Sequence, residues 1–126
     1  MYTDPISDLL TRIRNAANAN HDTVSVPYSK LKENVLRVMH ENKFIKDVEK
    51  EEKKPFPELT ATLFENRLLT LKRISSPGQR LYIKKENIKG TKGGLGIIIL
   101  STSKGVMAAT KAKKLNIGGE LICEIY

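Results

Sequence analysis

The most distinctive segment of the chain is a run of three hydroxyl side chains followed by a lysine and a glycine, Ser101-Thr102-Ser103-Lys104-Gly105. It comes directly after the apolar stretch 97–100, which predicts a buried strand that delivers the run to the surface. Hydroxyls can hydrogen-bond phosphate oxygens, ribose hydroxyls and base edges, lysine adds charge, and glycine permits a left-handed turn. The run therefore fits an oxygen-rich, anionic ligand, although an ordinary Ser/Thr-rich turn explains it equally well.

Two further groups of residues have a related chemical character. Tyr82 lies between Arg80 and Lys84, so its ring could stack on a base or ribose while the cations hold a phosphate backbone. A half-buried strand tyrosine fits the same pattern equally well. Gly118-Gly119-Glu120 would let backbone amides approach a ligand, with Glu120 accepting a hydrogen bond from a base. A two-glycine turn before an edge strand is the more common interpretation.

Positive charge is concentrated in the second half of the chain. The 126 residues carry 22 Lys and Arg against 14 Asp and Glu, a net charge of +8. Residues 66–126 account for +9 and residues 1–65 for −1, and all 8 glycines lie in the second half. Such a surface favours polyanionic partners. We therefore predict two modules, an N-terminal α/β module at 1–65 and a C-terminal, β-rich RNA-binding module at 66–126.

The sequence lacks the residue patterns typical of catalytic or cofactor-binding sites. His21 and His40 are the only histidines, and Cys123 is the single cysteine, so neither a disulfide nor a thiolate metal cluster is expected. The glycine patterns of nucleotide-binding folds do not occur. No apolar run approaches the ~20 residues of a membrane span, and the N-terminus lacks the layout of a signal peptide. We expect an intracellular protein without cofactor, small-molecule substrate or membrane contact.

The first half predicts the order helix, strand, helix, strand, strand. Apolar spacing of three and four predicts helices after Asp4-Pro5 and after the N-cap Ser29, the second ending near Asn42. Their buried stripes are expected to be Ile6, Leu9, Leu10, Ile13 and Ala17 in the first helix, and Leu31, Val35, Val38 and Met39 in the second. Strands are expected at 23–26, 44–48 and 59–63, with an exposed loop at 49–57.

The second half predicts mostly antiparallel strands with one short helix, so the fold class is α/β (α+β). A strand over 68–74 is expected to return on 59–63, and Ser76-Pro77-Gly78 to form a hairpin with a strand through Tyr82. The segment 84–96 has room for one short helical turn. A strand at 97–100, a weakly capped helix at 108–115 and a last strand from Gly119 complete the order.

Four blocks of residues follow one another in an order more specific than any single motif. They are Asp4-Pro5-Ile6 with Leu10 to Asn15; Ser29 to Lys32; Lys72 to Ser75 with Pro77-Gly78 and Arg80 to Tyr82; and Gly94 to Ile97 with Leu100 to Val106, then Gly118 to Glu120 before Cys123. Nearly from end to end, the chain thereby resembles a known family, the eighth protein of the bacterial small ribosomal subunit. It departs from that family at Ala108-Ala109, where a Thr-Asp helix cap is usual.

This resemblance implies a two-module protein that binds the central domain of small-subunit ribosomal RNA and touches neighbouring small-subunit ribosomal proteins, without catalysis. Some bacterial members of the family also repress translation of their own messenger. The residues that the resemblance implies to meet an irregular internal loop of an RNA helix are Tyr82, Ser101, Thr102, Ser103, Lys104, Gly105 and Glu120. From their place beside these residues, Arg80, Gly118 and Gly119 are also expected to bind RNA. Secondary RNA contacts are expected at Thr3, Asp4, Arg12, Arg14, Asn15, Lys30, Lys54, Lys84 and Lys113.

Two rival functions stay open at this point. A regulator acting on DNA or messenger RNA would be expected to present a basic recognition helix, but the basic residues here cluster on strands and loops. A small enzyme with a phosphate-bearing ligand would need an acid and base pair that the sequence does not supply. A cytoplasmic, ribosomal location is expected, and an organelle origin stays open.

Overall fold

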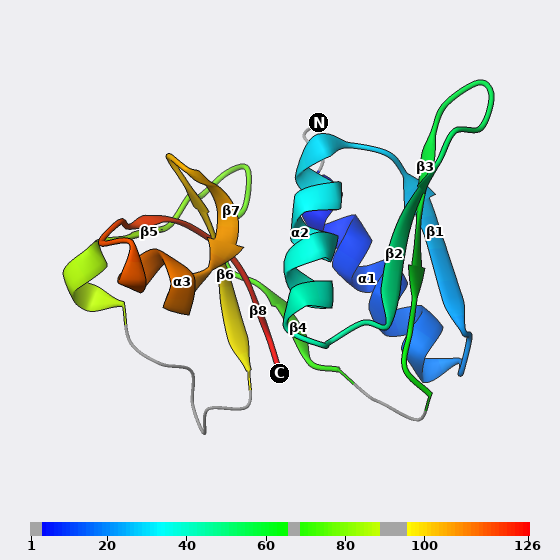
Figure 1. Cartoon of the computed structure of the whole chain (residues 1–126), viewed down its shortest axis with the longest axis horizontal. Coiled ribbons are helices and arrows are strands. Elements are labelled where there is room, and N and C mark those ends of the chain that lie inside the picture. Colours follow the sequence, from blue (N-terminus) through cyan, green and yellow to red (C-terminus); the bar gives the residue numbers. More distant parts are fainter. Residues whose placement is uncertain (1–3, 66–68, 89–95) are drawn as a thin grey trace. The chain divides into compact units, whose positions relative to one another are not determined.

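The computed structural model describes residues 4–65, 69–88 and 96–126, and the chain divides into two compact units (Figure 1). One unit is Pro5–Leu69; the other is Thr70–Tyr126 and also includes Asp4. Both combine helices with an antiparallel sheet, which confirms the predicted mixed α/β class. The assignment of separate roles to 1–65 and 66–126 stays a prediction.

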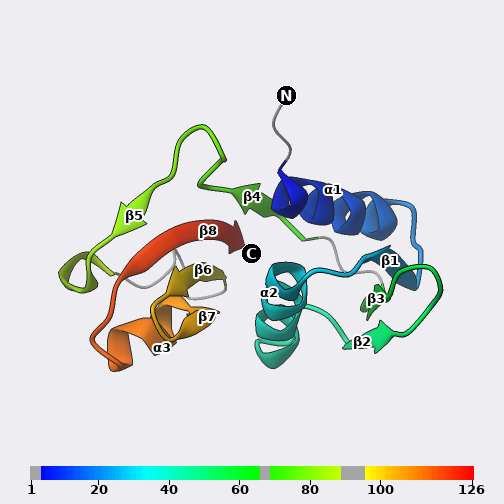
Figure 2. The same ribbon diagram turned by 90° about the horizontal axis from the view of Figure 1, so that it is seen from above.

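In the unit Pro5–Leu69, two helices cover one face of a three-stranded sheet (Figures 1 and 2). The strands are ordered β1-β3-β2, and β3 pairs antiparallel with both neighbours. The elements are α1 (Pro5–Asn18), β1 (Thr23–Pro27), α2 (Lys30–Glu41), β2 (Asp47–Glu51) and β3 (Glu58–Thr62). Burial alternates along β3, where Leu59 and Ala61 are buried and their neighbours are partly exposed. One sheet face therefore packs on the helices and the other meets solvent.

Both helices form where the sequence predicts them. Ser29 caps α2, and its hydroxyl accepts a hydrogen bond from the backbone nitrogen of Lys32 at 3.2 Å. The prediction that Leu31 is buried is wrong, because 41% of its surface is exposed. The buried face of α2 is centred on Val35, Leu36 and Met39, which leaves Leu31 at its border in the first turn.

The predicted strand at 44–48 and the predicted exposed loop at 49–57 are both placed too early. Phe44 and Ile45 are buried but precede β2, because the backbone nitrogen of Phe44 donates to Met39 O and closes the end of α2. Glu49 to Glu51 belong to β2 rather than to a loop. An edge strand with one solvated face tolerates these charged residues.

In the unit Thr70–Tyr126, one long strand organises the sheet. The elements are β4 (Leu71–Arg73), β5 (Tyr82–Ile83), the 3-10 turn η1 (Lys85–Asn87), β6 (Ile97–Thr102), β7 (Gly105–Ala108), α3 (Ala109–Lys114) and β8 (Gly119–Ile125). The strand order is β4-β8-β6-β7, and β5 also pairs with β8. Leu100 and Met107 form a core with Ile88 and the α3 residues Ala109 and Ala112.

Two predicted strand pairings are wrong. The strand predicted over 68–74, of which residue 68 lies outside the described part, pairs with β8 and not with β3. The turn at Ser76-Pro77-Gly78 forms, closed by a bridge from Ser76 to Gln79, but β4 and β5 each pair with β8 instead of with one another. Turn chemistry predicted the reversal, whereas the partner of each strand depended on distant residues.

The short helix α3 begins without a side-chain cap, as Ala108-Ala109 predicts. Ala108 is its N-cap residue and supplies no side-chain hydrogen bond. Packing of Ala109 and Ala112 against Leu100 and Met107 stabilises the helix in place of a cap. Among the described residues, no helix has the length and apolarity needed to cross a membrane.

Candidate nucleic-acid interface

The hydroxyl-rich run forms the tip of the β6–β7 hairpin. Thr102 is opposite Gly105, whose φ of 115° explains the glycine. The Thr102 hydroxyl donates to Gly105 O at 2.7 Å and accepts from the backbone nitrogen of Lys104 at 3.2 Å. Thr102 therefore builds the turn. Ser103 and Lys104 are exposed at its tip, and neither side chain bonds another residue in the part of the chain that the structure describes.

Strand register brings the three predicted groups together. Tyr82 on β5 is opposite Glu120 on β8, which in turn is opposite Ser101 on β6. Residues directly opposite one another in neighbouring strands project from the same face of a sheet. Tyr82, Glu120 and Ser101 thus form one row across three strands, with β8 between β5 and β6 (Figure 2). We call this row, with the hairpin tip at Ser103 and Lys104, the Tyr82 face.

The most prominent side chain of this face is Tyr82, with 68% of its surface exposed. This exposure argues against the half-buried alternative that the sequence left open. Beside the ring, Arg80 Nη1 donates to Glu120 Oε1 at 3.3 Å. Only 17% of the Glu120 side chain is exposed, against 60% for Arg80. Arg80 therefore holds the mostly buried carboxylate of Glu120 in position next to the exposed ring of Tyr82.

The glycine pair has a packing role at this face. A Cβ atom on Gly119 would lie 2.3 Å from Ser101 O, and one on Gly118 would lie 2.2 Å from Ile83 O. No side chain fits at such distances, so β8 can approach its neighbours only with glycine at both positions. Gly118 and Gly119 therefore allow the strands of the Tyr82 face to pack closely.

One positioning residue of this face was not predicted. Ser75 is fully buried, and its hydroxyl accepts from the backbone nitrogen of Leu81 at 2.8 Å and donates to Leu81 O at 3.1 Å. These bonds fix the segment that leads into Tyr82. Nothing in the composition around Ser75 distinguishes it from an exposed turn serine, so only the folded chain reveals its role.

The residues predicted for secondary RNA contacts are divided between the two units. Asp4, Lys84 and Lys113 belong to the second unit, whereas Arg12, Arg14, Asn15, Lys30 and Lys54 belong to the first, and Thr3 lies outside the described residues. Asp4 has an internal partner, because its Oδ2 lies 3.0 Å from Arg73 Nε and both side chains are mostly buried. Lys84 and Lys113 are exposed. Arg12 pairs with Asp8 at 2.9 Å, and Lys30 lies 3.6 Å from Glu33.

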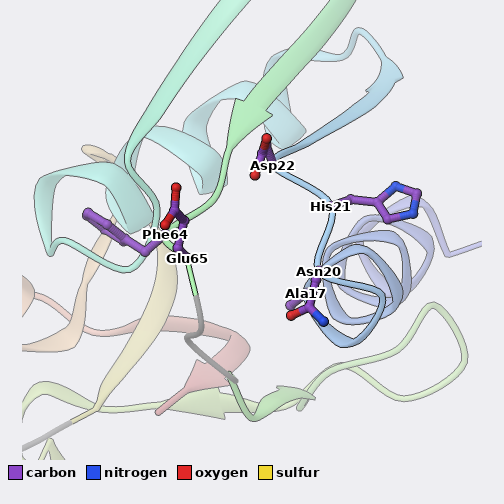
Figure 3. Close-up of a pocket in the computed structure, with 6 residues that line it drawn as sticks. All are labelled: Ala17, Asn20, His21, Asp22, Phe64 and Glu65. Carbon is purple, nitrogen blue, oxygen red and sulfur yellow. The ribbon is translucent and has the colours of Figure 1, made fainter.

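Elsewhere among the described residues, no alternative chemistry stands out. Burial raises the pKa of the Cys123 thiol to about 12 against an opposing effect of Arg73, so this thiol stays protonated at neutral pH. In the described ranges, no group of three His, Cys, Asp or Glu residues could hold a metal ion. A hollow of about 220 Å³ in the unit Pro5–Leu69 contains none of the predicted site residues (Figure 3). Its lining is Ala17, Asn20, His21, Asp22, Phe64 and Glu65.

Comparison with known proteins decides the family. The sequence model of the family described as Ribosomal protein S8 matches residues 4–126. The chain belongs to this family. It is 45% identical over 130 residues to the small ribosomal subunit protein uS8 of an Anaeromyxobacter species, covering 99% of this chain and 98% of that protein. The protein of the same name from Oleidesulfovibrio alaskensis is 48% identical over 126 residues, covering 100% of both chains.

Membership confirms the resemblance to the bacterial ribosomal protein S8 family that the four sequence blocks carry. The family is structural and not enzymatic, so the prediction of a non-catalytic protein is also confirmed. As a ribosomal protein, the chain has ribosomal RNA and other ribosomal proteins as its partners. The enzyme alternative is thereby excluded.

Proposed function

We propose that the protein is a structural component of the small ribosomal subunit in the cytoplasm, where the Tyr82 face binds an irregular internal loop in a helix of the central-domain RNA. The observation that carries this proposal is the row of Tyr82, Glu120 and Ser101 beside the exposed hydroxyl of Ser103, which bonds no other described residue. An exposed ring, a carboxylate held by Arg80 and a solvent-facing hydroxyl on one face suit stacking and hydrogen bonding to unpaired bases.

An internal loop is the RNA feature that this face fits best. A regular RNA duplex has a deep, narrow major groove that side chains cannot read, so sequence-specific proteins bind loops and bulges whose bases are unstacked. The ring of Tyr82 offers a stacking platform, worth about 1–3 kcal/mol per base. Glu120 can accept from a base amino group, and Ser103 can donate to a base or ribose oxygen.

The cations around the face supply affinity without selectivity. Lys84 and Lys104 are exposed in the same unit as Tyr82, and Lys113 lies on α3. Neutralising phosphates releases counterions, which makes this part of the binding salt-dependent. Arg12, Arg14, Asn15, Lys30 and Lys54 of the first unit are proposed as further backbone contacts that support subunit assembly.

Salt-titrated binding of the full-length protein tests the proposal. The probes are the central-domain RNA helix with its internal loop and a fully paired duplex of equal length. We expect a preference for the looped RNA that persists at high salt. Ser103→Ala should weaken binding to the looped RNA by about 1–3 kcal/mol, because a buried RNA partner is left unpaired.

Two variants separate specific from general effects in that assay. Ser25→Ala removes an exposed hydroxyl in the other unit and should leave both RNAs bound as before. Lys113→Ala should lower the salt slope by about 0.7–0.9 without changing the preference for the loop. Equal binding of both RNAs that disappears with salt would refute the assignment of the Tyr82 face.

Repression of the protein's own messenger is a natural extension of this function. A face that recognises the shape of an internal loop would bind a messenger RNA that folds into a similar loop. In that case Ser103→Ala should weaken binding to ribosomal and messenger RNA in parallel. A variant that lost only the ribosomal target would exclude a shared surface.

A further inference from the structure

A second exposed aromatic residue lies in the unit Pro5–Leu69. Phe56 has 74% of its surface exposed and is held between Pro55 and Pro57. It belongs to residues 52–57, which connect β2 to β3 and extend beyond the ends of both strands (Figure 1). We call this connection the Phe56 finger. A phenylalanine so exposed contributes little to the stability of its own chain.

The base of the finger is braced, so Phe56 is presented on an ordered support. Glu51 and Glu58 are opposite one another in the sheet, and Lys53 Nζ lies 3.2 Å from Glu51 Oε2 and 3.1 Å from Glu58 Oε1. On one side Thr60 Oγ1 donates to Glu51 Oε1 at 3.0 Å. On the other the backbone nitrogen of Tyr28 donates to Pro57 O at 3.1 Å. Such preorganisation lowers the entropic cost of binding.

Most charged side chains at the base of the finger are paired with one another, whereas Lys54 is exposed and has no ion pair among the described residues. Besides the two bridges of Lys53, Lys50 Nζ lies 3.3 Å from Glu52 Oε1 and 4.2 Å from the centre of the Tyr28 ring. The hydrogen bonds to Glu58 and Glu51 raise the pKa of Lys53. Segment 49–58 contains four Glu and three Lys, a small negative excess. Apart from the exposed Lys54, such a surface offers a polyanion such as RNA few unpaired cations.

We propose that Phe56 anchors a protein contact, inserting into an apolar pocket rimmed by Lys or Arg on a neighbouring protein of the small subunit. The proposal rests on the proposed function, because it takes the partner from the same particle. Binding energy at protein interfaces is concentrated in a few buried aromatic anchors. A basic rim complements the small negative excess of segment 49–58. A hollow of about 300 Å³ beside Phe56, with Pro27, Pro57, Lys53 and Lys54 in its lining, can receive a partner side chain.

Photo-crosslinking in assembled subunits tests the contact directly. A benzophenone amino acid replaces Phe56 in one sample of the full-length protein and Tyr82 in another, and both are incorporated into small subunits. Position 56 should give an adduct that survives ribonuclease and contains one defined ribosomal protein. Position 82 should give an adduct with ribosomal RNA.

The two positions distinguish the two proposals. Two results would overturn the protein anchor and leave the proposed function intact. One is a crosslink from position 56 to RNA; the other is no crosslink from position 56 in subunits where position 82 does crosslink to RNA. An unsubstituted protein that does not enter subunits would overturn the proposed function, and the anchor with it.

A substitution provides a second, independent measurement. Phe56→Ala should leave thermal unfolding and binding to the isolated RNA helix unchanged, because the ring is exposed and lies outside the Tyr82 face. In competition with unsubstituted protein for assembly into subunits with all proteins present, it should be disfavoured by roughly tenfold or more, as expected for an interface anchor. Phe56→Trp should restore most of the difference. Equal incorporation of Phe56→Ala would contradict the proposal.

Discussion

Tyr82 and Phe56 are the most exposed aromatic side chains among the described residues, at 68% and 74%, yet their surroundings differ in kind. Around Tyr82 the cations are mostly unpaired and solvent-facing, with Lys84 and Lys104 exposed. Around Phe56 most charges are paired, with Lys53 shared between two carboxylates, and Lys54 is the exposed exception. Free cations attract phosphates, whereas paired charges leave an apolar anchor as the main source of binding energy.

The two regions are also supported differently. The strands of the Tyr82 face approach so closely that only glycine fits at Gly118 and Gly119. The Phe56 finger is braced at its base by exposed side-chain contacts among Glu51, Lys53 and Glu58. Close backbone packing is insensitive to salt and pH, but exposed ion pairs are not. The comparison can therefore be tested by perturbing packing and charge separately.

The largest effect is expected from Gly119→Ala. Its Cβ would lie 2.3 Å from Ser101 O, so β8 and β6 must separate. Forcing extra atoms into a packed site costs about 1–3 kcal/mol and occasionally more, and a clash with backbone belongs at the upper end. Chemical denaturation should show this loss in the free energy of unfolding, together with loss of looped-RNA binding.

Gly105→Ala is the matched control for that change. No atom lies within 4 Å of a Cβ at Gly105, but its φ of 115° is unfavourable for alanine. The cost should be about 1–2 kcal/mol, the scale of backbone strain alone. A Gly119→Ala protein as stable as the unsubstituted one would show that close packing does not hold the Tyr82 face together.

Local sequence signals predicted the helices well and the strand partners poorly. The N-cap at Ser29 and the apolar spacing around Leu9 and Ile13 depend on residues only a few positions apart, and both are confirmed. The pairing of β4 and β5 with β8 joins residues about fifty and forty positions apart, as in Leu71 with Ile125. Turn residues predict where a chain reverses but not which strand receives it.

The sequence indicated which residues could form the candidate site, but not which of them are bonded within the protein and which face solvent. Thr102 and Ser103 look alike in the sequence, yet the Thr102 hydroxyl is bonded within the turn and that of Ser103 is free of described partners. The carboxylate of Asp4 pairs with Arg73, 69 positions away, and the sequence did not predict this pair. The contact of Asp4 with RNA stays a prediction. Hydrogen-bond partners so distant in sequence leave no local signature.

A direct comparison of the two aromatic residues gives the next effect. Tyr82→Ala should weaken binding to the looped RNA by about 1–3 kcal/mol through loss of base stacking. Phe56→Ala should change the same affinity by less than about 0.5 kcal/mol, because substitutions of exposed residues outside a binding face usually have effects of this size. Filter binding or fluorescence anisotropy at fixed salt measures both. Equal losses would mean that both aromatics bind RNA and that their charge surroundings do not separate their roles.

The smallest effect is a local response of the Phe56 finger to pH. Hydrogen bonds from Thr60 and Lys53 hold the pKa of Glu51 below its ordinary value. A carboxyl whose pKa is lowered on folding stabilises the folded form above its unfolded pKa, and this contribution is lost as the pH falls through the lowered value. Acid should therefore loosen the finger, seen as a lower protection factor against hydrogen exchange for the Lys53 amide, which donates to Glu51 O.

Glu51→Gln at neutral pH separates this response from general acid destabilisation. Acid also protonates Glu33, whose pKa is lowered chiefly by its hydrogen bond from Arg37, so low pH alone weakens α2 as well. Gln at position 51 abolishes the ion pair with Lys53 while Glu33 keeps its charge. The Lys53 amide should then exchange faster, whereas the Leu121 amide, which donates to Leu81 O beside Tyr82, should be unaffected. Unchanged exchange at Lys53 would mean that the prolines alone order the finger, and that ion pairing does not distinguish its support from that of the Tyr82 face.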